Sequence, residues 1–127
     1  MKKALQFVLI FALLINTFYA FSQGVCGSVF TDSGGLNGSY SNSENVTTTI
    51  CPDNPGELVK ITFTSFSIEN NFDFLKVYDG SSPNAPLIGT YTGTTIPIIQ
   101  STAADGCLTF VFTSDSVINL TDRKSVV

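Results

Sequence analysis

The chain has 127 residues, a length that suits one domain, and its six basic and ten acidic residues give a net charge of −4. Without its first 22 and its last six residues, the chain holds two basic and nine acidic residues. Residues 23–121 therefore have a net charge of −7. So acidic a domain repels phosphate backbones, and we expect no nucleic-acid partner.

The first 22 residues have the pattern of a secretory signal peptide. Lys2 and Lys3 precede an apolar run at 5–14, and the small residues Ala20 and Ser22 stand at the −3 and −1 positions of a cleavage site. The run is too short for a membrane span, and no second one follows. We therefore expect a secreted or cell-surface protein without a transmembrane segment.

The next part of the chain alternates between short strands and turns. Residues 24–30 form a strand candidate that carries Cys26, and a glycine-rich loop follows at 31–40. A threonine-rich strand is predicted at 45–50 and ends at Cys51. The cluster Pro-Asp-Asn-Pro-Gly at 52–56 is typical of a turn.

Two strands joined by an acidic loop form the centre of the chain. Val59, Ile61 and Phe63 alternate with polar residues, which predicts a half-buried strand. Leu75 and Val77 predict a second strand by the same alternation, and the pair Asp-Gly at 79–80 closes it with a turn.

Three further strands are predicted toward the end of the chain. They cover residues 87–91, 96–99 and 107–113. Pro97 cannot donate a backbone hydrogen bond, so we expect the strand at 96–99 to lie at a sheet edge. In the last one, Leu108, Phe110 and Phe112 point inward. No segment after residue 22 shows a sustained helical period, so the sequence predicts an all-β, antiparallel β-sandwich in one domain.

The acidic loop between the two central strands brings oxygen donors together. Glu69 and Asp73 lie in it, with Asn70 and Asn71 between them. Carboxylate and amide oxygens are ligands of a hard cation such as calcium. An ordinary solvated polar loop is the alternative.

Three cysteines in a secreted chain leave one without a partner. We expect a disulfide between Cys26 and Cys51. Cys107 is then unpaired, and its partner would lie beyond the end of the sequence.

The tail at 122–127 breaks the pattern of the chain, because three of the chain's charges gather in it. The codons GAT CGG AAG AGC GTC GTG would encode it, and they match a common sequencing adapter. We expect these residues to be an assembly artefact and exclude them from the domain at 23–121.

Four motifs then occur in a fixed order. They are Cys-Gly at 26–27, Phe-Asp-Phe-Leu-x-Val-Tyr-Asp-Gly at 72–80, Pro-Leu-Ile-Gly-x-Tyr-x-Gly at 86–93 and Leu-Thr-Phe-x-Phe-x-Ser-Asp at 108–115. Through this set, residues 25–118 resemble a CUB domain, in the form found in secreted proteins of the Bacteroidetes type.

The resemblance implies a jelly-roll-like sandwich that binds proteins or carbohydrates and is not itself an enzyme. One subset of the family binds calcium, and its ligands correspond here to Glu69, Asp73 and Asp115. The resemblance also implies that the last strand of the domain is missing, so we expect residues 23–121 alone to be unstable or poorly soluble. A larger secreted hydrolase or protease, with its catalytic part elsewhere and further domains, is the alternative parent.

The chain departs from the family pattern in two places near this site. The acidic loop lacks a cysteine, and Thr92 stands where that cysteine's partner would be. A tyrosine that assists the calcium site is replaced near Glu44. The alternative roles are a turn residue for Asp73, a strand-end cap for Asp115 and a solvated side chain for Glu69.

Overall fold

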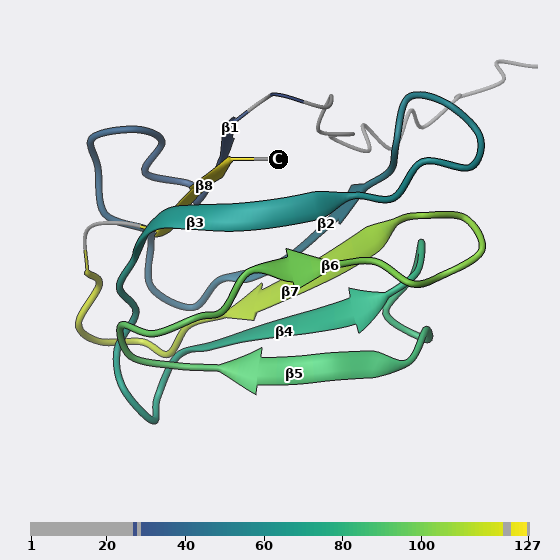
Figure 1. The fold of residues 1–127 in the computed structure, drawn as a ribbon. Coiled ribbons are helices and arrows are strands. Elements are labelled where there is room, and N and C mark those ends of the chain that lie inside the picture. The colour runs from purple at the N-terminus through teal and green to yellow at the C-terminus, as the bar shows by residue number, and fades with distance from the viewer. Residues whose placement is uncertain (1–26, 28, 121–122, 127) are drawn as a thin grey trace, which may run out of the picture.

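The computed structural model describes residues 27, 29–120 and 123–126, and this part of the chain contains eight strands and no helix (Figure 1). The strands are β1 (Val29–Thr31), β2 (Asn45–Ile50), β3 (Lys60–Phe66), β4 (Phe74–Asp79), β5 (Leu87–Tyr91), β6 (Ile99–Gln100), β7 (Leu108–Thr113) and β8 (Arg123–Val126).

The strands form two four-stranded sheets with antiparallel pairing. One has the order β1-β8-β3-β6 and the other the order β2-β7-β4-β5. Figure 1 shows the two sheets stacked, with β3 and β6 in one layer and β4 and β5 in the other. The prediction of an all-β antiparallel sandwich is confirmed.

The core lies between the sheets and follows the predicted alternation in β4 and β7. Leu75, Val77 and Leu108 have no exposed surface. Phe110 and Phe112 are each 1% exposed. These inward faces meet because β4 and β7 are paired along their whole length, from Phe74↔Thr113 to Asp79↔Leu108. The pairing thus places the start of β4 beside the end of β7.

The alternation in β3 changes after its first half. Val59 and Ile61 are buried as predicted, but the next fully inward side chain is Phe66. The pairing of β3 with β8 shifts between Phe63 and Ser65, which indicates a β-bulge. An extra residue at such a bulge moves the following side chains to the other face.

The disulfide joins Cys51 to Cys107, with Cα atoms 4.2 Å apart. The predicted bridge between Cys26 and Cys51 is therefore wrong, and Cys107 is not unpaired. The pairing of β2 with β7 explains this, because Ile50 and Leu108 are partners and the two cysteines are the next residues beyond them. Cys26 lies outside the described residues.

Two strands near the ends of the sheets differ from their predicted places. β6 begins at Ile99, later than the predicted 96–99, although it does lie at a sheet edge as Pro97 suggested. Residues 123–126, which the sequence analysis set aside, form β8 between β1 and β3.

The backbone of these residues thus takes part in the sheet, and backbone hydrogen bonds form a sheet whatever the side chains are. The origin of the tail and the truncation of the domain stay predictions. The predicted signal peptide lies outside the described residues. Within the described residues, no helix is long and apolar enough to cross a membrane.

Candidate metal centre

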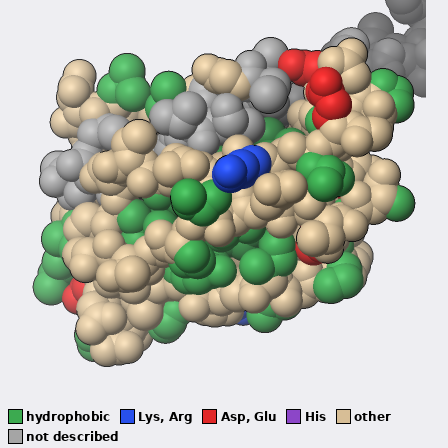
Figure 2. Space-filling view, viewed as in Figure 1, with side chains coloured by type: hydrophobic (Ala, Val, Ile, Leu, Met, Phe, Trp, Pro, Cys, Tyr) green, Lys and Arg blue, Asp and Glu red, His purple; other side chains and the backbone are tan. Residues whose placement is uncertain are grey.

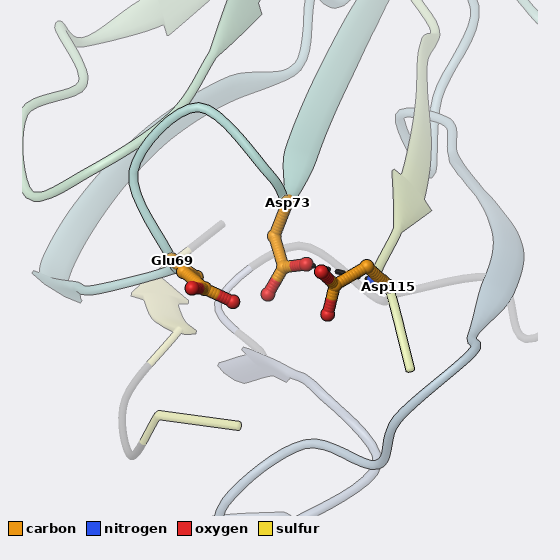
Figure 3. Close-up of side chains that lie close together, drawn as sticks. All are labelled: Glu69, Asp73 and Asp115. Atoms are coloured by element: carbon orange, nitrogen blue, oxygen red, sulfur yellow. Dashed lines mark hydrogen bonds between the residues drawn. The ribbon is translucent and has the colours of Figure 1, made fainter. Parts of the chain in front are cut away.

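Three carboxylates from separate segments meet at one end of the sandwich (Figure 3). Glu69 lies in the loop after β3, Asp73 directly precedes β4, and Asp115 follows β7. One carboxylate oxygen of each lies within 4.8 Å of those of the other two. The structure thus brings together the three residues that the resemblance selected.

Asp73 is the buried centre of the group, with no exposed surface. Its Oδ1 accepts a hydrogen bond from the backbone N–H of Asp115 at 2.9 Å, drawn as a dashed line in Figure 3. Its Oδ2 accepts one from the hydroxyl of Tyr40. Both oxygens are therefore held in place, and the start of β4 is tied to the end of β7.

Tyr40 is a site residue that the sequence analysis missed. It is fully buried, and its hydroxyl also accepts the backbone N–H of Glu69 at 3.1 Å. Burial and the hydrogen bond to Asp73 raise the pKa of Tyr40 to about 12, so the hydroxyl keeps its proton. The resemblance implies that a tyrosine is replaced near Glu44, and Tyr40 provides a phenol four residues earlier in the chain.

Glu69 carries an oxygen without a partner. Its Oε2 is buried and makes no hydrogen bond. Burial, followed by the charges of Asp115 and Asp73, raises the pKa of Glu69. A buried, unpaired carboxylate oxygen beside two other carboxylates is unfavourable unless a proton or a cation neutralises it.

Thr92 anchors the acidic loop at the place where the resemblance had indicated a missing disulfide. Its hydroxyl accepts the backbone N–H of Asn71 at 2.8 Å and donates to the backbone carbonyl of Glu69 at 3.1 Å. Next to it, Ile68 N–H donates to the carbonyl of Gly93 at 2.9 Å. Hydrogen bonds thus join this loop to the end of β5.

The segment that carries Asp115 is fixed to the loop before β2. Ser114 Oγ donates to the carbonyl of Ser41 at 2.8 Å and accepts the N–H of Glu44 at the same distance. Asn42 Nδ2 donates to the carbonyl of Ser116 at 2.9 Å. Asp115 therefore lies near the other carboxylates on a turn that these hydrogen bonds hold in place.

The donor set consists of oxygens, which suits a hard cation such as calcium. Between residues 29 and 120, Lys60 and Lys76 are the only basic residues. Lys60 opens β3, at the far end of that strand from Glu69, and Lys76 points outward from β4. In the described part of the chain, neither lysine forms an ion pair with the three carboxylates.

A family model described as the CUB domain matches residues 26–122 of this chain. Canine cubilin is 35% identical over 109 residues, which cover 73% of this chain and 3% of cubilin. Human tolloid-like protein 1 is 42% identical over 66 residues, which cover 48% of this chain and 6% of that protein. The chain thus spans a small part of these relatives.

Solved structures show the same fold. The crystal structure of the MASP-1 CUB2 domain bound to Ca²⁺ has a TM-score of 0.63 at 20% identity, covering 81% of this chain and 95% of that one. The CUB1-EGF-CUB2 structure of human MASP-1/3 has a TM-score of 0.66 at 20% identity, and the match covers 82% of this chain and 39% of that one. At this identity the likeness supports the fold alone.

Proposed function

Because this chain belongs to the CUB domain family, we propose that it is a non-catalytic binding module that uses calcium to recognise a protein or carbohydrate outside the cell. Glu69, Asp73 and Asp115 would hold the calcium ion. The observation that carries the proposal is the buried, unpaired Oε2 of Glu69 within a group of three converging carboxylates. Calcium supplies the positive charge that this group lacks.

The choice of calcium rests on the chemistry of the donors. All three are carboxylates, and calcium accepts six to eight oxygen ligands in a flexible arrangement, whereas magnesium demands a stricter geometry. The Ca²⁺-bound MASP-1 CUB2 domain shares the fold of this chain and supports the choice.

The charge of the occupied site points to the kind of group it would meet. Three carboxylates and one calcium ion leave one negative charge, so a basic group on a partner is attracted and an acidic one repelled. The face of the molecule in Figure 2 has few charged side chains, with one basic group near its middle and its most visible acidic side chains at the upper right. Through the charge of the three carboxylates, this end of the sandwich would fit a partner with a basic side chain.

A second proposal concerns the parent protein. The chain spans 3% of cubilin and 6% of tolloid-like protein 1, so CUB domains of this kind occur as small parts of long chains. Targeting of a larger secreted hydrolase or protease is the alternative function. A mature protein extended beyond residue 127 by a catalytic domain would favour it.

An extracellular location is part of the proposal. It rests on the signal-peptide pattern at 1–22 and on the disulfide between Cys51 and Cys107, since such bonds persist in oxidising compartments. The Bacteroidetes-type origin rests on the sequence resemblance alone.

Calcium binding is tested by calorimetric titration of the purified protein. We expect one calcium ion per chain, a higher melting temperature with calcium, and little response to magnesium at the same concentration. Replacing Asp115 with Asn should weaken calcium binding by about tenfold or more, because the site loses one of its three charges.

The matched control is Asp53→Asn, which removes an exposed charge from the turn at 52–56. This variant should bind calcium like the parent. Absence of a calcium-dependent change in heat or melting temperature in the folded parent protein would refute the proposal.

A further inference from the structure

Exposed apolar side chains flank the three carboxylates on the loops that carry them. Phe72 directly precedes Asp73, and Val117 and Ile118 follow Asp115. Their exposed fractions are 60%, 56% and 60%. We call Phe72, Val117 and Ile118 the apolar rim.

Hydrogen bonds hold the two loops of the apolar rim against each other. The backbone N–H of Asp115 donates to Asp73 Oδ1 at 2.9 Å, and the N–H of Val117 donates to Asp115 Oδ1 at 2.9 Å. The two loops that carry the apolar rim are therefore linked next to the carboxylates.

The exposure of the apolar rim is unfavourable for an isolated domain. Each of these side chains keeps more than half of its surface exposed in the described part of the chain, and apolar surface is more stable when it is buried. Ile118 also adopts a φ of 55°, a left-handed conformation that is rare for a β-branched residue. Three exposed apolar side chains on the two linked loops that carry a candidate ligand site are a candidate interaction surface.

We propose that the apolar rim selects a protein partner that presents a bulky apolar side chain directly beside a basic one. This inference rests on the proposed function, in which the calcium-loaded carboxylates attract the basic group. The neighbouring side chain of the partner then lies over Phe72, Val117 and Ile118 and buries them. Charge attracts the partner, and apolar contact distinguishes it from other basic segments.

The charge of this end of the sandwich favours a protein segment over a lipid surface. Apolar side chains around a calcium site could also enter a membrane, but calcium leaves the three carboxylates with one negative charge. Residues 23–126, which include the basic residues of β8, have a net charge of −6. Anionic headgroups would be repelled, whereas a basic segment would be attracted.

The test uses the ¹⁵N-labelled protein with saturating calcium and two synthetic peptides, followed by NMR titration. The first peptide is acetyl-Gly-Gly-Lys-Phe-Gly-Gly-amide, and in the second glycine replaces phenylalanine. We expect the lysine–phenylalanine peptide to bind about tenfold more tightly, because it alone reaches the apolar rim. The resonances of Phe72 and Val117 should shift only with that peptide.

Two variants of the apolar rim, Phe72→Ser and Val117→Ser, should reduce this preference to twofold or less and leave the calcium affinity unchanged. The matched control is Leu87→Ser. Leu87 is 52% exposed and lies at the start of β5, the end of that strand away from Thr92 and the acidic loop. This control should keep the full preference.

The outcomes separate the two proposals. Calcium-dependent binding of both peptides with equal affinity would overturn the role of the apolar rim and keep the proposed function. Absence of calcium binding would overturn both. Calcium-dependent binding to phosphatidylserine vesicles with no preference between the peptides would overturn the protein partner in favour of a membrane.

Discussion

Tyr40 shows at the scale of single residues how the core supports the site. Its ring packs edge-on against Phe112 with centroids 5.0 Å apart, and its hydroxyl contacts Asp73 and the backbone of Glu69. The aromatic ring thus belongs to the core and the hydroxyl to the site. A buried carboxylate such as Asp73 requires such a donor to be stable.

Replacing Tyr40 with Phe should lower the free energy of unfolding in the absence of calcium by about 1–3 kcal/mol, since the N–H of Glu69 loses its acceptor. Urea denaturation measures this change. Tyr91→Phe is the matched control, because Tyr91 is half-buried and its hydroxyl has no hydrogen-bond partner in the described part of the chain. Equal losses in the two variants would contradict the role of the Tyr40 hydroxyl.

At the scale of elements, the pairing of β2 with β7 decides the disulfide. Ile50 faces Leu108, so the residues just outside this pair, Cys51 and Cys107, lie within bonding distance. The bond closes a long loop, with a sequence separation of 56 that includes β3, β4, β5 and β6. It therefore constrains most of the unfolded chain.

The double variant Cys51→Ala and Cys107→Ala should lower the free energy of unfolding by about 4 kcal/mol on the chain-entropy model. Guanidinium denaturation of the oxidised protein measures it. Cys26→Ala should have a much smaller effect, which also distinguishes this bond from the bridge that the sequence suggested. A loss in Cys26→Ala as large as in the double variant would contradict the assignment.

At the scale of the whole molecule, acidic side chains stabilise the end of the sandwich opposite the site. Asp79 accepts hydrogen bonds from Ser101, Thr102 and Ala103 and so fixes the loop after β6. Burial alone would raise the pKa of Asp79, but the hydrogen bonds from Thr102, Ser101 and Ala103 outweigh it and lower that pKa.

Asp105 acts in the same region. Its pKa is lowered chiefly by the backbone N–H of Cys107 and next by hydrogen bonding with Ser81. Asp79 and Asp105 thus favour the folded state only in their charged forms.

Acid should therefore destabilise the protein in a defined window. A carboxyl with a lowered pKa contributes its full stabilisation above its unfolded-state pKa, near 4, and loses it as the pH falls through the lower folded-state value. The free energy of unfolding without calcium should fall below about pH 4. Chemical denaturation at a series of pH values measures this decline.

Asp79→Asn should reduce the steepness of the decline, because the variant has no carboxyl to protonate there. Asp53→Asn serves as the control, since Asp53 is exposed and accepts no hydrogen bond within the described residues. An unchanged pH dependence in the Asp79 variant would contradict the role of this carboxylate.

The sequence by itself determined the sandwich and most of its strands, because alternation of apolar and polar residues is a local property. Leu75, Val77 and Phe110 show this, since each is buried on the face that the alternation predicted. The grouping of Glu69, Asp73 and Asp115 came from the family motif. Local pattern could not have joined Asp115 to the other two, which lie more than 40 residues earlier.

Only the tertiary structure decided the contacts that depend on strand pairing and loop packing. The partner of Cys51, the approach of the Tyr40 hydroxyl to Asp73 and the bracing of the acidic loop by Thr92 all join residues far apart in the chain. Each follows from which strands are neighbours and in which register, and a one-residue shift would alter them all. That register is set by packing of the whole core, which no single segment of the sequence encodes.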